Sequence, residues 1–208
     1  MAKFDITLVV DRSGSMRSIS EGTVQGINNF IEEQKALPGE TTFSMYQFDD
    51  RYTADRYKEE FPSEVFRSKG KYTPEVKYSD FQPRGDTALV DAACKVIDST
   101  GERLAKLPAH ERPDGVVMVI VTDGLENAST QFTKADLKKR IEHQKEKYNW
   151  KFIYLGANQD AILEGAQYGI DKKDTSNFVY TNAGVTRGLS TASATTGLYR
   201  TETIDAKV

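Results

Sequence analysis

Three short polar segments of this sequence carry the side chains that could do chemistry. Segment 11–15 reads Asp-Arg-Ser-Gly-Ser, segment 84–87 reads Arg-Gly-Asp-Thr, and Asp-Gly stands at 123–124. The oxygen-bearing side chains that they could bring to one site are two carboxylates and two or three hydroxyls: Asp11, Ser13, Ser15, Thr87 and Asp123. The set contains no His or Cys, so its chemistry is that of hard oxygen donors.

Oxygen donors of this kind favour a hard dication, Mg²⁺ in particular, bound at about 2.1 Å with waters completing its shell. The two-residue spacing of Asp11, Ser13 and Ser15 lets alternate side chains of a tight loop point to one ion. Two carboxylates leave such a site near neutral and hydroxyls donate weakly, so the ion would remain electrophilic. A site of this kind would take a further anionic ligand.

The polar segments follow apolar stretches that predict buried strands. Segments 4–10 (FDITLVV) and 115–122 (GVVMVIVT) are short and rich in β-branched residues, which is typical of parallel strands buried on both faces. Segment 84–87 opens a helical pattern. In a doubly wound sheet, ligands bind outside the carboxyl ends of the strands, so we expect the three polar segments to meet in one crevice.

The remaining patterns alternate between strand and helix. Helical spacing predicts helices over about 19–37, 87–108 and from 133, where Thr133 and Asp136 form a capping box. Strands are predicted at 41–48, 150–155 and 178–180, with a turn at 156–158 leading into a short helix. Segment 51–57 looks extended and would pair with 41–48 at a sheet edge.

These elements predict an α/β fold: a three-layer, Rossmann-like, doubly wound sheet with helices on both faces. The domain would span 1–181. Within it, the charged segment 58–83 contains three prolines and only short strand pieces, and it could be an insertion. Segment 182–208 begins with a run rich in Gly, Ser, Thr and Ala, which indicates a small-residue helix or a tail.

Three motifs together resemble the von Willebrand factor A (vWA) family and its metal-ion-dependent adhesion site (MIDAS). They are Asp-x-Ser-x-Ser at 11–15, Gly-Asp-Thr-Ala-Leu at 85–89 and Thr-Asp-Gly at 122–124. They occur in the family's order and on the expected elements, and the resemblance covers about 4–180. It implies a mostly parallel sheet with one antiparallel edge strand.

The resemblance also implies a function. Mg²⁺ or Mn²⁺ would be held directly by Ser13, Ser15 and Thr87, while Asp11 and Asp123 would act largely through water. The open coordination position would take an Asp or Glu of a partner protein, so the expected role is protein binding and the chain is not expected to be an enzyme. A lone domain of this kind is similar to intracellular bacterial or phage members.

One departure from the family concerns residue 86. The family commonly has Gly-Gly-Thr before the second helix, whereas this chain has Asp86. That carboxylate could tighten metal binding, repel an acidic ligand, or face solvent as a helix cap. Glu126 could reach the rim of the site, although a surface or helix-start role is favoured. The Arg-Gly-Asp tripeptide at 84–86 overlaps the predicted site and is interpreted as coincidence.

Composition excludes several function classes. The chain has 28 Lys and Arg against 31 Asp and Glu, with no block of basic residues, so neither nucleic acid nor a membrane surface is an expected partner. It lacks an apolar leader with a cleavage site and any apolar stretch near eighteen residues, which predicts a cytoplasmic protein. The single Cys94 and two distant histidines do not suggest a zinc site.

Other functions remain as alternatives. A structural or assembly component could keep this fold without metal-dependent binding. An Mg²⁺-dependent phosphatase-like hydrolase is disfavoured because such enzymes generally need Asp-x-Asp after the first strand, and Ser13 occupies the second position. Phosphate-binding glycine motifs and a Gly-x-Ser-x-Gly elbow are missing from the sequence, which argues against a nucleotide-binding protein and a serine hydrolase.

Overall fold

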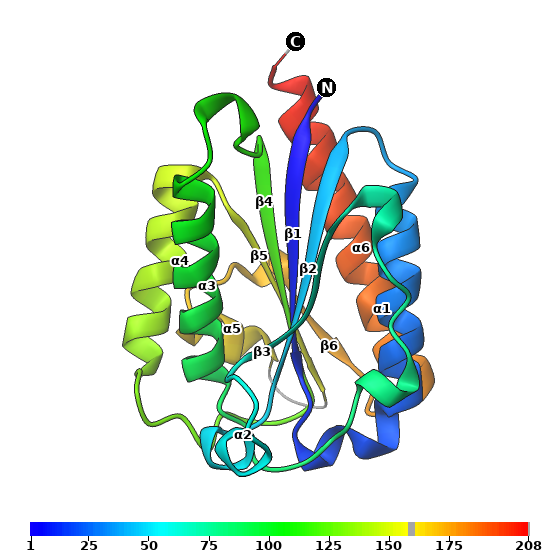
Figure 1. The fold of residues 1–208 in the computed structure, drawn as a ribbon, viewed down its shortest axis with the longest axis vertical. Coiled ribbons are helices and arrows are strands. Elements are labelled where there is room, and N and C mark those ends of the chain that lie inside the picture. Colours follow the sequence, from blue (N-terminus) through cyan, green and yellow to red (C-terminus); the bar gives the residue numbers. More distant parts are fainter. Residues whose placement is uncertain (158–160, 208) are drawn as a thin grey trace.

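Six strands form one sheet in the order β3-β2-β1-β4-β5-β6 in the computed structural model, which describes residues 1–157 and 161–207 (Figure 1). The strands are β1 (Lys3–Asp11), β2 (Glu40–Phe48), β3 (Ser63–Lys69), β4 (Gly115–Thr122), β5 (Lys151–Ala157) and β6 (Thr175–Phe178). Neighbours are parallel except for β2 and β3, which are antiparallel. The predicted sheet with one antiparallel edge strand is confirmed.

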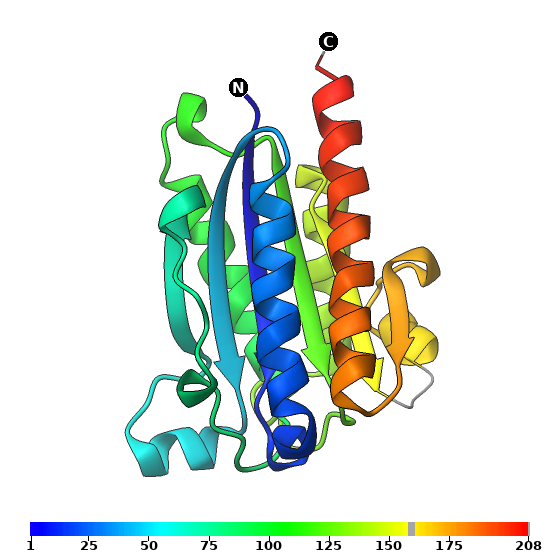
Figure 2. The same ribbon diagram turned by 90° about the vertical axis from the view of Figure 1, so that its right-hand side faces the viewer.

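Helices cover both faces of this sheet. One face carries α1 (Ser20–Lys35) and α6 (Asn182–Asp205), which lie side by side in Figure 2, and the other carries α3 (Leu89–Ala105), α4 (Lys134–Tyr148) and α5 (Ala161–Gln167). The central strand β4 is buried along its whole length because alternate side chains enter the two apolar cores. This two-sided burial explains the continuous apolar sequence at 115–122.

The helix α6 arises from the segment expected to be a small-residue helix or a tail, of which Val208 lies outside the described residues. Its first residue lies close to Gly22 of α1: a Cβ built on Gly22 would lie 2.2 Å from the carbonyl oxygen of Asn182, and Asn182 Oδ1 accepts a hydrogen bond from the Gly22 amide at 2.9 Å. Farther along, the buried Arg200 donates hydrogen bonds to the carbonyl oxygens of Gln34 and Pro38, both at 2.8 Å. Polar contacts therefore fix α6 against α1 at both ends.

The prediction of an extended segment at 51–57 is wrong, because Arg51–Tyr57 is the short helix α2. The side chain of Asp50 caps it by accepting a hydrogen bond from the Thr53 amide at 2.8 Å. The antiparallel edge strand is instead β3, within the segment described as a possible insertion. Its half-buried, charged sequence gave little periodicity. Asn158, in the predicted turn at 156–158, lies outside the described residues.

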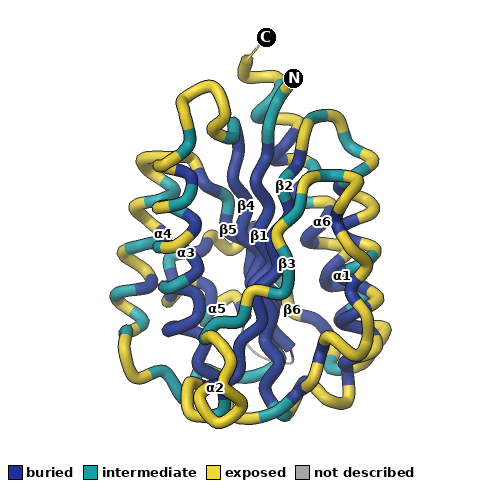
Figure 3. The backbone as a smooth tube through the Cα atoms, viewed as in Figure 1, coloured by how far each residue is buried: buried dark blue, intermediate teal, exposed yellow. Residues whose placement is uncertain are grey.

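The sheet has two functionally different edges. We call the edge where the parallel strands end the carboxyl edge, and the edge where they begin the amino edge. Helix α2 lies at the carboxyl edge, whereas both chain termini lie at the amino edge (Figure 1). Figure 3 shows that the central strands are buried while α2 is largely exposed. None of the helices in the described residues is both long and apolar enough to span a bilayer.

Candidate metal centre

The three polar segments meet at the carboxyl edge, as the topology predicts. Main-chain hydrogen bonds join them: the Arg84 amide donates to the Arg12 carbonyl at 2.8 Å, and the Gly14 amide donates to the Gly85 carbonyl at 3.0 Å. The Asn127 amide, beyond the end of β4, donates to the Thr87 carbonyl at 3.0 Å. Segments that are far apart in the sequence therefore form one continuous polar surface.

Asp11, the last residue of β1, is fully buried beneath this surface. Its Oδ1 accepts a hydrogen bond from the Ser13 amide and its Oδ2 accepts one from Thr122 Oγ1, both at 2.6 Å. Burial, with a smaller contribution from the charge of Asp123, nevertheless raises the pKa of Asp11 to about 7. Two good hydrogen bonds thus do not compensate for removing this carboxylate from water.

Ser13, Ser15 and Asp123 form a chain of hydrogen bonds above Asp11. The two serine Oγ atoms are 3.1 Å apart, and Ser15 Oγ donates to Asp123 Oδ1 at 2.8 Å. The other carboxylate oxygen, Asp123 Oδ2, is buried and has no hydrogen-bond partner among the described residues. Burial raises the pKa of Asp123 as well. The site therefore holds an unsatisfied acceptor next to two hydroxyls.

Thr87 supplies the third hydroxyl from the loop before α3. Its amide donates to Asn127 Oδ1 at 2.9 Å, which fixes its backbone against the segment after β4. A Cβ built on Gly124 would lie 3.7 Å from Thr87 Oγ1, so this hydroxyl faces the residue that follows Asp123. The structure thus brings all five predicted residues to the same part of the carboxyl edge.

The arginines beside the site are engaged elsewhere. Arg12 pairs with Asp49 at 3.2 Å and with Glu59 at 2.6 Å, and Arg84 pairs with the same two carboxylates at 2.8 Å. The Arg84 guanidinium also lies 4.1 Å from the centre of the Tyr57 ring. Asp11 and Asp123 make no ion pair within 1–157 and 161–207. Within the described part of the chain, these two carboxylates therefore have no cation beside them.

A family model for the von Willebrand factor type A domain matches residues 5–191, most of the chain. The chain belongs to this family. Its vWA fold accounts for the mixed sheet and for the meeting of the three motifs at the carboxyl edge. No curated protein sequence matches the chain.

Several solved structures share the fold of this vWA domain. Proximal thread matrix protein 1 from the mussel byssus has a TM-score of 0.58 at 15% identity, covering 94% of this chain and 46% of its own. The pilus adhesin SpaC from Lactobacillus rhamnosus GG has a TM-score of 0.62 at 12% identity, and the match covers 93% of this chain and 30% of SpaC. Manganese-loaded TRAP from Plasmodium vivax has a TM-score of 0.54 at 15% identity, and the match covers 88% of this chain and 71% of TRAP.

Two of these neighbours contain a metal. The byssus protein has also been solved with zinc in its MIDAS motif, with a TM-score of 0.56 at 15% identity, covering 94% of this chain and 46% of that one. The TRAP structure is loaded with manganese. The present chain spans less than half the length of the byssus protein and of SpaC. At these identities, the likeness establishes the shared vWA fold.

The donor set of this vWA domain fits a divalent cation. No group of three His, Cys, Asp or Glu side chains suited to a metal occurs in the described residues. The candidate centre instead combines two carboxylates with hydroxyls. The raised pKa of the buried Asp11 and the unpartnered Asp123 Oδ2 both indicate that a positive charge would be favourable here.

Supporting residues around the site were not identified from the sequence. The buried Asp91 of α3 accepts hydrogen bonds from the amides of Thr130, Gln131 and Phe132 and so shapes the loop after β4. Glu126 accepts from the Val90 amide at 2.7 Å, at the start of α3. Of its two proposed positions, Glu126 therefore takes the helix-start one. An acidic residue early in a helix was the only sequence signal for Asp91.

Asp86 lies exposed beside Thr87. It does not cap α3, whose N-cap residue is Ala88. Its amide donates to Asp50 Oδ2 at 2.8 Å, which joins the site loop to the cap of α2. A Cβ on Gly85, whose φ is +66°, would lie 2.2 Å from the same oxygen, so a glycine is required at this junction.

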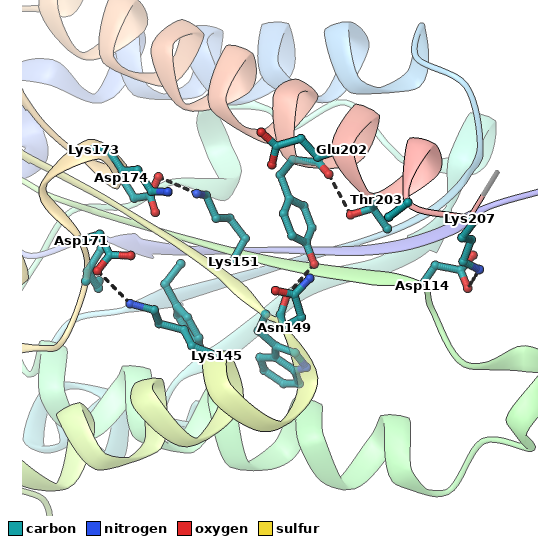
Figure 4. Close-up of a pocket in the computed structure, with 15 residues that line it drawn as sticks. Asp114, Lys145, Asn149, Lys151, Asp171, Lys173, Asp174, Glu202, Thr203 and Lys207 are labelled. Carbon is teal, nitrogen blue, oxygen red and sulfur yellow. Dashed lines mark hydrogen bonds and ion pairs between the residues drawn. The ribbon is translucent and has the colours of Figure 1, made fainter.

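A groove of about 490 Å³ lies at the amino edge, away from the metal centre (Figure 4). Six of its charged side chains form three ion pairs: Lys145 with Asp171 at 3.1 Å, Lys151 with Asp174 at 2.6 Å, and Lys207 with Asp114. These opposite charges satisfy one another within the protein, in contrast to the acidic groups of the metal centre.

Proposed function

We propose that this vWA domain binds a divalent cation at its carboxyl edge and, through that cation, an acidic residue of a partner protein. The observation that carries the proposal is a pair of carboxylates, the fully buried Asp11 and the half-buried Asp123, that no cation of the described residues neutralises. Mg²⁺ or Mn²⁺ suits the donors because both ions prefer oxygen ligands.

The residues of the centre would have different roles. Ser13, Ser15 and Thr87 would hold the ion through their hydroxyl oxygens. Asp123 accepts from Ser15 Oγ and so orients that hydroxyl, while Asp11 fixes the loop by accepting from the Ser13 amide. The bound cation supplies an electrophilic position, and a partner Asp or Glu is the ligand of matching charge and hardness.

Binding rather than catalysis is the activity that we propose. The position two residues after Asp11, where phosphatase-like enzymes place a second carboxylate, is Ser13. Two of the structural neighbours are a matrix protein and an adhesin. A structural or assembly role without metal is the competing function, and the same experiment separates it from metal-dependent binding.

The test is a calorimetric titration of Mg²⁺ and Mn²⁺ into EDTA-treated protein. The parent is expected to bind one equivalent, and an Asp11→Ala, Ser13→Ala double variant is expected to bind none while keeping the parent's circular dichroism spectrum. An Asp174→Asn variant in the amino-edge groove serves as a control that should bind like the parent. A folded parent that binds neither ion would contradict the proposal and favour the structural role.

The partner ligand requires its own test. Immobilised peptides containing Glu or Asp can be screened against the domain in Mg²⁺ and again in EDTA. Binding is expected only in Mg²⁺, and a Glu→Gln change in a bound peptide should abolish it. Binding that persists in EDTA and through that peptide change would show that the partner is held by another surface.

A further inference from the structure

The connection between β6 and α6 reaches over the metal segment through one side chain. Tyr180 donates a hydrogen bond from its hydroxyl to the Ser15 carbonyl oxygen and accepts one from Ser18 Oγ at 2.7 Å. One phenol therefore links segment 15–18 to the connection between β6 and α6.

The backbone that carries Tyr180 is itself held in place. The side chain of Thr181 caps α6 by accepting from the Gly184 amide at 3.0 Å. Asn182 Oδ1 accepts from the Gly22 amide at 2.9 Å, at the start of α1. The Tyr180 ring also packs against the core beneath α1 and α6. The phenol hydroxyl is thus a fixed point relative to the sheet.

Ser15 is the member of the centre that most needs such support. It is exposed, and it lies in a short 3-10 helix, Gly14–Ile19, that has no side-chain cap at its first residue. A serine on an exposed loop loses rotamer and backbone freedom when it binds an ion, and this loss weakens binding unless the loop is already ordered. A hydrogen bond to the Ser15 carbonyl supplies that order before the ion arrives.

We propose that Tyr180 is a positioning residue of the metal centre: by holding the Ser15 carbonyl, it aims Ser15 Oγ at Ser13 Oγ and Asp123 and so raises cation affinity. The inference rests on the proposed metal binding. It assigns a role to a residue outside the three motifs, in a connection 165 positions away from Ser15. It also joins the connection that precedes α6 to the metal centre.

The variant that tests this role is Tyr180→Phe, which removes only the hydroxyl. The loss of this one hydrogen bond corresponds to roughly a 3- to 10-fold weaker affinity for Mg²⁺. Tyr199→Phe is the matched control. The Tyr199 hydroxyl, from α6, also donates to a carbonyl oxygen, that of Asn149 at 2.7 Å, but this contact lies at the amino edge, away from the metal centre. Its Mg²⁺ affinity should equal that of the parent.

A combined variant shows whether Tyr180 acts through Ser15. In a Ser15→Ala background, where the aimed hydroxyl is missing, Tyr180→Phe should weaken Mn²⁺ or Mg²⁺ binding by less than about twofold. The full 3- to 10-fold loss in that background would overturn the positioning role. So would equal affinities of Tyr180→Phe and the parent, or equal losses in Tyr180→Phe and Tyr199→Phe.

Amide exchange of segment 14–18 in EDTA gives a measurement that does not depend on metal. The Met16 amide donates to the Ser13 carbonyl at 3.0 Å, and its exchange should be several-fold faster in Tyr180→Phe and unchanged in Tyr199→Phe. If the parent binds no cation, the proposed function fails, and exchange alone decides whether Tyr180 holds the segment. Unchanged exchange in Tyr180→Phe would overturn the role.

Discussion

The two ends of the β1–β4 strand pair shift the pKa of an aspartate in opposite directions. At the carboxyl edge, burial raises the pKa of Asp11 to about 7. At the amino edge, burial also acts on Asp114, but hydrogen bonds from Lys207 and from the Lys3 amide lower its pKa overall. Asp11 is fully buried with no cation beside it, whereas Asp114 is only half-buried and pairs with Lys207, so the difference comes from burial together with neighbouring charge.

This contrast identifies the carboxyl edge as the region where negative charge is not neutralised by a cation of the described residues. The amino-edge groove is a hollow of about 490 Å³, but three of its lysines pair with three of its aspartates. The arginine cluster next to the metal centre is paired in the same way. Only a comparison of pairing, rather than of volume or of the number of charges, separates the candidate metal centre from these surfaces.

Asp11→Asn gives the largest expected effect. Cation affinity should fall by about 10- to 100-fold, since the side chain that fixes the segment loses its charge. In EDTA at pH 8 the variant should nevertheless be more stable than the parent, by on the order of 2 kcal/mol, because a buried charge is removed while Thr122 can turn its hydroxyl toward Gly124. Calorimetry and urea unfolding measure the two quantities.

The contrasting variant is Asp114→Asn, which removes a charge that is already paired. It should leave cation affinity unchanged and lower stability by roughly 0.5–1 kcal/mol. If both variants shifted stability in the same direction, the two edges would not differ in the way described.

The pH dependence provides the second largest effect. The pKa of Asp11 is about 7 in the folded protein, against an ordinary value of 3.8 for an aspartate, so between these pH values the folded state binds more protons than the unfolded state. The stability contributed by protonated Asp11 is present below about pH 4 and is lost as pH rises to about 7. Mg²⁺ competes with the proton, so its affinity should rise about tenfold per unit below pH 7 and level off above it.

Melting temperatures at pH 5 and pH 8, each with EDTA or Mg²⁺, check this dependence. Asp11→Asn isolates the contribution of Asp11 from that of other titrating groups, because its stability should not show the same loss. A Mg²⁺ effect of equal size at both pH values would mean that Asp11 does not couple to the ion.

Asp174→Asn should have a smaller effect, confined to the amino edge. Asp174 is 6% exposed and pairs with Lys151 at 2.6 Å, so its replacement leaves a half-covered ammonium without its partner. Unfolding free energy should fall by about 1 kcal/mol, while calorimetric Mg²⁺ affinity should not change. A change in affinity would show that the two edges are coupled through the sheet.

The smallest effect is expected for Asp86→Asn. The Asp86 side chain is exposed, where water and salt screen its charge, and its contact with the rest of the site runs through the backbone. Mg²⁺ affinity should change by less than about twofold at 0.15 M salt. A tenfold loss would instead identify Asp86 as part of the metal environment and would answer the question raised by its departure from the family pattern.

The sequence predicted the parts of the fold that depend on local pattern. Segments 4–10 and 115–122 predict buried strands because they are apolar on both faces. Because the carboxyl ends of parallel strands lie at one edge of the sheet, the three motifs are then expected to meet there. Segment 51–57 was mistaken for a strand because seven residues with one buried side chain, Ala54, have no readable period. The edge strand β3 was hidden for a similar reason, since it is only half covered.

The supporting contacts of the site could not be predicted in this way. Asp91 receives its hydrogen bonds from residues about 40 positions away, and Tyr180 reaches Ser15 across most of the chain. Such contacts follow from how the layers pack, and no spacing within one segment records them. The motif residues could be predicted because each lies at or next to the end of a strand or helix that the sequence pattern itself indicates.

Both chain termini lie at the amino edge, opposite the metal centre (Figure 1). A linker attached at either end would therefore anchor the domain with its metal-bearing surface directed outward. Immobilisation on a sensor chip or display on a particle through either terminus would give the same presentation, and capture experiments could use the two orientations of the fusion as replicates rather than as alternatives.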